Sequence, residues 1–408
     1  MLDLGRLAAQ IQALGDAEAQ ALTRSGAELA RAREELAKAT AAPEPLVAKT
    51  DRARTSWLVA RLAGPPGEAT PPPPLPARVT VIGVDGSQIE PDHHEGLACY
   101  VLNVGTVVLH YGEPAGAPCA FLESHPRLCY EEADVAVVVG GRRVPVTGEL
   151  LGFKRSLAEL DHLLRLALAA REEGRKHVVG LIDGSLIRWG AENSRVVPDT
   201  FLDDYLARFE RLREAGVPLA GYISQSRAAD VVNALRVQVC PEETPDCDRC
   251  PYVPGATYPR ADRSWAGPGL PCEVIAGVLD RRLFESVLAV GERSPLFGSR
   301  SSVLAKRYGE TQTIDFCYLN VGPELARIEV PRWVARDPAL LGLVHAVCLD
   351  QARKGNGYPV ALAEAHQRAV VRGAERTLFY QMVEEALVKR GVRRWRSPKA
   401  LHKVGLTV

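Results

Sequence analysis

The chain has 408 residues, with 50 basic and 50 acidic side chains, no formal net charge and 46% hydrophobic residues. This length suits two domains or one large domain with an appendage, and no apolar run approaches the length of a membrane span. A neutral total charge excludes a surface that is basic everywhere, so any nucleic-acid binding must come from a local patch. The N-terminus lacks the basic and apolar regions of a signal peptide, so we expect a cytoplasmic protein with reduced thiols.

Residues 1–63 are predicted to form a helical extension. Leu4, Leu7, Ile11 and Leu14 recur at the spacing of one helix face, and alanine and charged residues follow them. This apolar face either docks on a partner or a second copy of the chain, or packs on the protein's own domain.

A proline-rich linker and a basic tail bound the predicted main domain. Residues 64–76 contain two proline runs, which favour a stiff and extended chain, so the main domain is expected over residues 77–390. The tail, residues 391–408, is basic and contains Trp395. Such a stretch either binds nucleic acid through phosphate contacts and base stacking, or is a solvated helix end.

Two copies of Asp-Gly-Ser each follow a predicted strand. Residues 79–84 precede Asp85 and residues 178–182 precede Asp183, so we expect each aspartate at the C-terminal end of a buried strand, where Gly-Ser turns the chain away. Two such ends on neighbouring strands would bring two carboxylates to one side of a sheet, as a site for Mg²⁺ or Mn²⁺. The alternative is ordinary Asp-Gly turn chemistry without a metal.

The remaining segments predict a mixed sheet covered by helices. Hairpin strands are expected within residues 98–111, a further strand at 133–139, and a helix at 149–173 with one apolar stripe. His93 and His94 fall in a predicted loop. Antiparallel strands followed by alternating strands and helices are typical of the α/β (mixed α+β) class. The later predicted segments are helix 201–213, strand 219–224, helix 227–235, strands 311–320 and 325–330, and helices within 338–390.

Three cysteines cluster in a proline-rich segment. Cys240, Cys247 and Cys250 are separated by six and two residues. This spacing resembles the start of the iron–sulfur loop of some DNA glycosylases, whose fourth cysteine follows five residues later and is missing here. Cys272 is the next cysteine, and we expect it to close an insertion loop, residues 240–272, around a structural Zn²⁺ or an iron–sulfur cluster. The alternative is a loop with merely reduced thiols.

A late helical segment completes a pattern of chemistry-bearing residues. Pro359 is placed to begin a helix, so that Tyr358 lies just before its start and His366 about two turns into it. Four features occur in a fixed order over residues 77–376. They are Asp-Gly-Ser on an early strand, a helical glutamate, a second Asp-Gly-Ser-Leu, and Tyr-Pro followed by Ala-His. In this order and spacing the chain resembles the NurA nucleases, DNA-end-processing enzymes that work with the hexameric HerA translocase.

The resemblance implies a ribonuclease-H-like fold and assigns site residues by position. Asp85 and Asp183 match the family's metal-binding aspartates, and Tyr358 and His366 match its C-terminal tyrosine and histidine. His366 would either bind metal or carry a proton, because imidazole titrates near neutral pH. Tyr358 would position a phosphate or a water, because a phenol is a poor base at pH 7.

The family's glutamate lies on the helix before the second aspartate. Glu159, in the middle of the predicted helix, is the expected match, and Glu149 at the helix start is the fallback. Together with the two aspartates it would hold one or two Mn²⁺ or Mg²⁺ ions, which is the ligand set of metal-assisted phosphodiester hydrolysis.

The resemblance also implies an activity and partners. It implies a 5′→3′ exonuclease with single-strand endonuclease activity, acting on DNA as a homodimer whose two sites flank a central DNA passage. The chain has no Gly-x4-Gly-Lys-Ser/Thr loop, so ATP-driven movement must come from a HerA-like hexameric ATPase. The family often carries a lysine where this chain has Gln225, so the chain either uses another cation, such as Arg227, or has weaker activity.

Two other functions stay open at this point. A non-catalytic DNA clamp or adaptor of the same translocase complex would keep the fold and the partner contacts, with Gln225 as a mark of lost activity. A carboxylate-pair hydrolase that acts on sugars would work in EDTA, and it gives no reason for the spacing of Tyr358 and His366.

Overall fold

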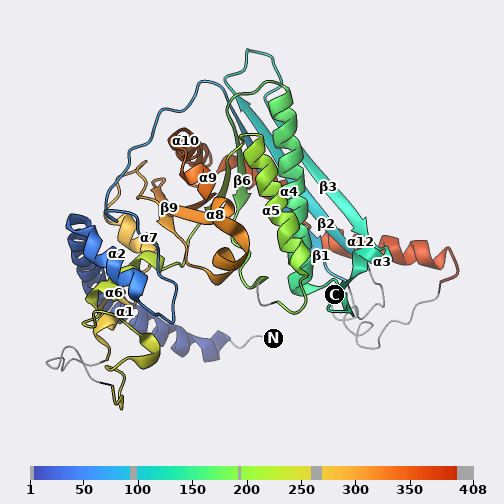
Figure 1. The fold of residues 1–408 in the computed structure, drawn as a ribbon. Coiled ribbons are helices and arrows are strands. Elements are labelled where there is room, and N and C mark those ends of the chain that lie inside the picture. Colours follow the sequence, from blue (N-terminus) through green and yellow to red (C-terminus); the bar gives the residue numbers. More distant parts are fainter. Residues whose placement is uncertain (1–3, 92–98, 192–193, 259–268, 393–408) are drawn as a thin grey trace. The chain divides into compact units, whose positions relative to one another are not determined.

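The computed structural model describes residues 4–91, 99–191, 194–258 and 269–392, so His93, His94 and most of the predicted basic tail lie outside it. The chain forms two compact units (Figure 1). The first unit comprises Met1–Pro72, Ile223–Ala305 and Ile314–Glu329, and the second comprises Pro73–Tyr222, Lys306–Thr313 and Val330–Val408. Each unit is therefore assembled from separate stretches of the sequence. The predicted domain boundaries stay predictions.

The second unit contains the predicted mixed sheet. Its strands lie in the order β3-β2-β1-β6-β7. β1 pairs antiparallel with β2 and parallel with β6, and β6 pairs parallel with β7. This confirms the mixed α+β class. The strand bounds are β1 Val79–Ile89, β2 Tyr100–Tyr111, β3 Ala120–Cys129, β6 Val178–Asp183 and β7 Leu219–Ile223, with a separate hairpin of β4 Ala136–Val139 and β5 Arg142–Pro145.

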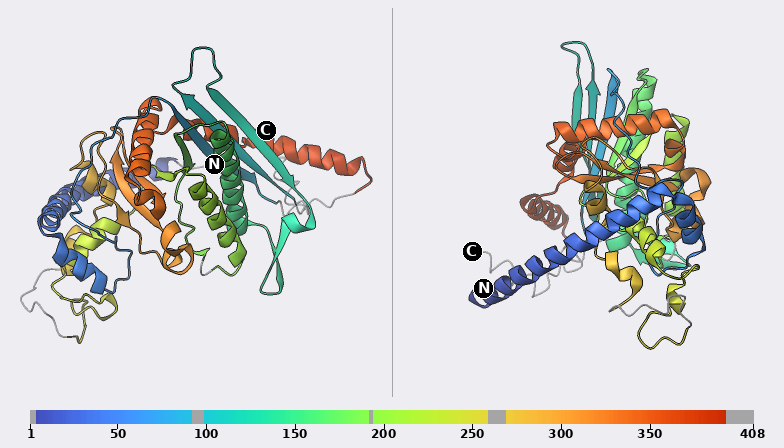
Figure 2. Two further views of the ribbon diagram at one scale, coloured as in Figure 1. Left: turned by 45° about the horizontal axis from the view of Figure 1, so that its top comes forward. Right: turned by 90° about the vertical axis from the view of Figure 1, so that its left-hand side faces the viewer.

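Helices cover both faces of this sheet. A Cβ on Gly180 of β6 would lie 2.8 Å from the Leu163 side chain of α4, so α4 packs on that face. Figures 1 and 2 show α4 and α5 side by side over the strands. A Cβ on Gly83 of β1 would lie 2.5 Å from the carbonyl oxygen of Ala361 in α11, so α11 packs on the opposite face. The helices of this unit are α3 Glu132–Val135, α4 Gly148–Glu172, α5 Asp199–Glu214, α8 Gly309–Gln312, α9 Arg332–Ala335, α10 Pro338–Lys354, α11 Val360–Ala369 and α12 Gly373–Val388.

The first unit is built around the N-terminal helices. The predicted helical extension folds as α1, Leu4–Ala41, and α2, Pro43–Arg52; α1 is one long helix (Figure 2). Its C-terminal half packs inward through Ala32, Leu36 and Ala39, whereas Leu4, Ile11 and Leu14 of the predicted apolar face are exposed. The other elements of this unit are α6 Asp230–Val239, α7 Asp280–Glu285, β8 Phe297–Gly298, β9 Ile314–Asn320 and most of β10 Leu325–Pro331.

Two local predictions were wrong. No turn follows Asp85, because β1 continues to Ile89 and its pairing with β2 extends from Val79 opposite Tyr111 to Ile89 opposite Val101. The predicted hairpin within residues 98–111 is the single strand β2, and its antiparallel neighbour β3 was missed. Most residues of β3 are exposed, so this edge strand lacks the apolar run on which the other strand predictions rested.

Candidate active site

Asp85 and Asp183 lie on neighbouring strands. The parallel register pairs Val84 with Ile182, so the two aspartates are the next residues on each strand. Side chains alternate between the faces of a strand, so Asp85 shares the face of Gly83, against which α11 packs. Asp183 is the last residue of β6 and pairs with Tyr222 of β7. The structure thus brings together the two carboxylates of the repeated motif.

His366 of α11 is held against Asp85. Its Nδ1 lies 2.7 Å from Asp85 Oδ2, and the other carboxylate oxygen of Asp85 accepts a 2.8 Å hydrogen bond from the N–H of Gly86. The His366 side chain is 56% exposed, against 19% for Asp85. The contact uses Nδ1, so Nε2 is the ring nitrogen that does not face Asp85.

Glycines and polar side chains fix α11 in this position. A Cβ on Gly105, which pairs with Asp85 across β1 and β2, would lie 2.1 Å from the carbonyl oxygen of Ala365. The Ser87 hydroxyl donates to the carbonyl oxygen of Ala369, and Asn103 Nδ2 donates to the same oxygen at 2.8 Å. The serine of the first Asp-Gly-Ser therefore holds the end of the helix that carries His366.

Glu159 of α4 approaches the same strand from the opposite face. Its side chain is buried, and burial is the main cause that raises its pKa to about 7. The negative charges of Asp85 and Asp183 raise this pKa further, while Arg155 and Arg188 lower it. Arg155 Nε lies 3.2 Å from Glu159 Oε1. The three carboxylates are thus close enough for their charges to interact.

Glu149, the fallback residue, does not reach this place. It is exposed in the first turn of α4 and accepts a hydrogen bond from Ser194 Oγ at 3.2 Å. Ten residues along a helix correspond to ~15 Å, so Glu149 is far from the position of Glu159.

The two Asp-Gly-Ser glycines serve different purposes. Gly184 has a φ of +94° and donates its N–H to the carbonyl oxygen of Tyr222 at 2.8 Å, so it makes the predicted turn after the strand. Gly86 lies inside β1, and a Cβ there would be 2.3 Å from Glu159 Oε1. The missing side chain of Gly86 therefore makes room for the glutamate.

Replacing Gly86 with alanine should displace Glu159 and reduce metal binding and activity by about 10-fold or more, because a ~1 Å misplacement of a reacting group is already costly. The matched control is Gly152→Ala, in the same helix as Glu159 but with open space around it, since a Cβ added there would meet nothing within 4 Å. That change should be neutral or slightly stabilising, since alanine favours a helix. Equal activity of both variants would show that Glu159 does not need the space at Gly86.

Tyr358 lies two residues before α11, ahead of its N-cap Pro359. Its ring meets the ring of Tyr222 edge to face, with 5.5 Å between the centroids, and the Tyr222 hydroxyl donates to the carbonyl oxygen of Gly357 at 3.4 Å. Since Tyr222 pairs with Asp183, these contacts bring Tyr358 to the end of β6.

Sequence reasoning missed three residues at this site. Tyr222 supports Tyr358, and Arg155 pairs with Glu159. Arg188 donates to Ser156 Oγ at 2.6 Å and to the carbonyl oxygen of Ser185. Only Arg155 left a signal in the sequence, because it precedes Glu159 by four residues and such helical pairs face each other.

The family model for the NurA domain matches residues 79–371, which is most of the chain. The chain belongs to the NurA domain family. It is similar to the NurA nuclease of Sulfolobus solfataricus, at 12% identity and a TM-score of 0.43, over 76% of this chain and 85% of that one. A NurA structure bound to dAMP and manganese is 13% identical with a TM-score of 0.34, over 78% and 89% of the two chains. No curated protein matches the sequence significantly.

The donor set of this NurA domain fits a hard divalent cation in chemical type. Asp85, Asp183 and Glu159 offer only carboxylate oxygens, and a cation between them would remove the mutual repulsion that contributes to the raised pKa of Glu159. Within the described ranges, no three His, Cys, Asp or Glu side chains already stand where they could share one metal ion. Binding would therefore require side-chain movement, for example of Glu159 away from Arg155.

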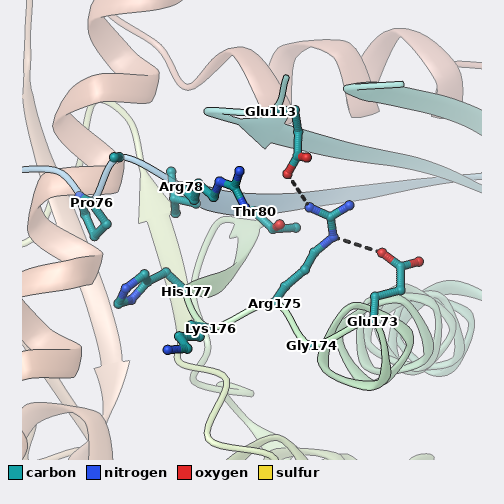
Figure 3. A pocket seen from close by; sticks show the side chains of 11 residues that line it. Pro76, Arg78, Thr80, Glu113, Glu173, Gly174, Arg175, Lys176 and His177 are labelled. Atoms are coloured by element: carbon teal, nitrogen blue, oxygen red, sulfur yellow. Dashed lines mark hydrogen bonds and ion pairs between the residues drawn. The ribbon is translucent and has the colours of Figure 1, made fainter. Parts of the chain in front are cut away.

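A cavity of about 610 Å³ lies at the other end of the same strands (Figure 3). It is lined by Thr80 near the start of β1 and by His177 before β6, whereas Asp85 lies five residues further along β1 and Asp183 is the last residue of β6. Figure 3 shows Arg175 between two acids, 2.7 Å from Glu113 and 2.9 Å from Glu173. This pairing and the distance along the strands separate the cavity from the carboxylate site.

Gln225 and Arg227 belong to the first unit. The side-chain oxygen of Gln225 accepts a hydrogen bond from Arg281. The role of Arg227 as a replacement for the family's lysine stays a prediction. No described helix of this NurA-domain protein is long and apolar enough to cross a membrane.

Proposed function

We propose that this NurA-domain protein is a divalent-metal-dependent DNA nuclease. The observation that carries the proposal is the approach of Glu159, through the gap at Gly86, to the strand that holds Asp85 beside Asp183. Three carboxylates whose charges interact, with a histidine paired to one of them, are the groups that metal-assisted phosphodiester hydrolysis uses.

Each of these residues has its own proposed role in the reaction. The three carboxylates would hold Mn²⁺ or Mg²⁺, which when bound supplies positive charge to the scissile phosphate and acidifies a water. Asp85 orients the His366 ring through Nδ1, so that Nε2 can give a proton to the leaving oxygen. Tyr358, held by the Tyr222 ring, positions a phosphate oxygen or a water.

A groove next to His366 suits a DNA strand. It has a volume of about 720 Å³ and follows His366 along the chain through Gln367, Arg368 and Arg372 to Phe379. Arginines bind phosphates and an aromatic ring stacks on bases, and this combination is typical of single-strand binding. The acidic Glu375 also lines the groove, so its charge is mixed.

The finer features of the proposal come from the family. They are 5′→3′ exonuclease and single-strand endonuclease activity, a homodimer around a central DNA passage, and assembly with a HerA-like ATPase. Copurification with such an ATPase and the mass of the protein in solution test the last two features.

Mn²⁺ binding tests the proposed site directly. Titration calorimetry should show at least one Mn²⁺ site per chain, and Asp183→Asn should weaken it strongly because one charged ligand is lost. A non-catalytic clamp or adaptor would bind DNA and the ATPase but would not need Mn²⁺. Equal Mn²⁺ binding by the wild-type chain and by Asp183→Asn would overturn the proposed ligand set.

A further inference from the structure

The cysteine loop of the first unit gathers four thiols around one cavity. Cys240, Cys247, Cys250 and Cys272 all line a mostly apolar cavity of about 150 Å³. The other five cysteines lie elsewhere in the chain and do not line it. Residues up to 32 positions apart thus converge without a disulfide, which an unstructured loop would not achieve.

Backbone contacts hold the loop in place. The N–H of Arg54 donates to the carbonyl oxygen of Pro245 at 2.8 Å, and the N–H of Cys247 donates to the carbonyl oxygen of Arg54 at 2.9 Å. A short 3₁₀ turn, Cys247–Arg249, then leads to Cys250. The turn brings the two cysteines of the Cys-x2-Cys pair to the same cavity, as metal-binding loops do.

Hydrogen-bond donors and cations surround the sulfurs. The backbone N–H groups of Glu242 and Ser56 donate to the sulfurs of Cys240 and Cys247. Arg236 donates to the Cys272 sulfur and lies over the Trp57 ring at 3.9 Å. Burial raises the pKa of all three thiols, and these donors oppose the shift because they stabilise the thiolate, which is the form that binds metals.

Trp57 adds an unsatisfied donor. It lines the same cavity, and its indole N–H is buried without a hydrogen-bond partner among the described residues. A buried donor without a partner is costly, and an acceptor bound in the cavity would remove this cost.

The spacing of the thiols distinguishes two kinds of metal site. Four cysteines around one Zn²⁺ bring their sulfurs to about 3.8 Å from each other, as follows from a Zn–S distance of ~2.3 Å and tetrahedral geometry. Within the described ranges no three such side chains are gathered to share a single ion. In an iron–sulfur cube each cysteine binds a different iron, so the sulfurs stand farther apart around a central volume.

We propose that Cys240, Cys247, Cys250 and Cys272 bind an iron–sulfur cluster, with the Trp57 indole N–H as a hydrogen-bond donor to it. The cluster would tie the loop to the segment that follows α2 and to α6 of the first unit, and it would take no part in hydrolysis. This proposal does not depend on nuclease activity.

The test is the metal content of the full chain purified without oxygen and reconstituted with ferrous iron and sulfide. We expect iron and acid-labile sulfide in equal amounts, near four of each per chain for a cube, with visible charge-transfer absorbance. Cys272→Ser and Cys247→Ser should lose both elements and the absorbance. Cys119→Ser is the matched control, because Cys119 is exposed and does not line the cavity, and it should retain them.

Two results would overturn the proposal. One zinc ion per chain without sulfide would show a mononuclear site. Neither iron nor zinc in the wild-type chain after reconstitution would show a loop of reduced thiols. Because the metal content of the wild-type chain decides both outcomes, the test stays decisive even if a serine variant folds poorly.

Discussion

Asp85→Asn should lower metal-dependent DNA cleavage about 1,000-fold or more. The change removes the charge of a proposed metal ligand next to Asp183 and weakens the contact with His366, whose Nδ1 lies 2.7 Å from Asp85 Oδ2. Loss of such a ligand costs several kcal/mol of transition-state stabilisation, and ~4 kcal/mol corresponds to that factor. The measurement is the initial rate on end-labelled DNA with saturating Mn²⁺.

Asp161→Asn is the control for this change. Asp161 lies on α4 near Glu159 in sequence but is half exposed, and it pairs with Arg208 at 2.8 Å on the surface. An exposed pair contributes little, so both cleavage and folding should be unchanged. If Asp85→Asn retained the wild-type rate, the assignment of Asp85 to the reaction would be wrong.

Glu159→Gln should have opposite effects on activity and on stability. Cleavage should fall by a factor similar to that for Asp85→Asn, because a carboxylate ligand is lost. The metal-free protein should become more stable at pH 8 by about 3 kcal/mol, the equivalent of raising the pKa of Glu159 from 4.5 to about 7. Urea unfolding in EDTA at pH 8 and at pH 4.5 measures the stability.

The sign of this effect follows from proton binding. Between pH 4.5 and 7 the folded protein keeps Glu159 protonated while the unfolded chain has lost the proton, so folding stability falls as pH rises through this window. Glutamine removes this dependence, and the variant and the wild type should therefore converge near pH 4.5. Glu149→Gln, at the exposed start of the same helix, should show neither effect. A less stable Glu159→Gln variant at pH 8 would contradict the raised pKa.

Much of the site could be predicted from local patterns. Two apolar runs that each end in Asp-Gly-Ser place Asp85 and Asp183 on strands, and the apolar stripe of residues 149–173 places Glu159 in the middle of α4. Pro359 marks the start of α11, so Tyr358 lies before this helix and His366 lies on it. These signals work because they depend only on strand alternation, helix periodicity and the conformation of proline and glycine.

The rest depends on tertiary contacts that leave no local trace. Gly86 and Gly184 occupy the same place in the same tripeptide, but one makes room for Glu159 and the other adopts a positive φ. The difference arises because β2 continues beside β1, whereas β6 ends at Asp183. Arg188 and Tyr222 reach the site only through the packing of separate segments.

The most direct test of the account is a cleavage assay on the purified wild-type chain. End-labelled single- and double-stranded DNA would be incubated with Mn²⁺, with Mg²⁺ or with EDTA. We predict cleavage that requires the metal ion and stops in EDTA. No cleavage of either substrate with Mn²⁺, even after addition of the HerA-like ATPase and ATP, would contradict the nuclease assignment and favour the clamp.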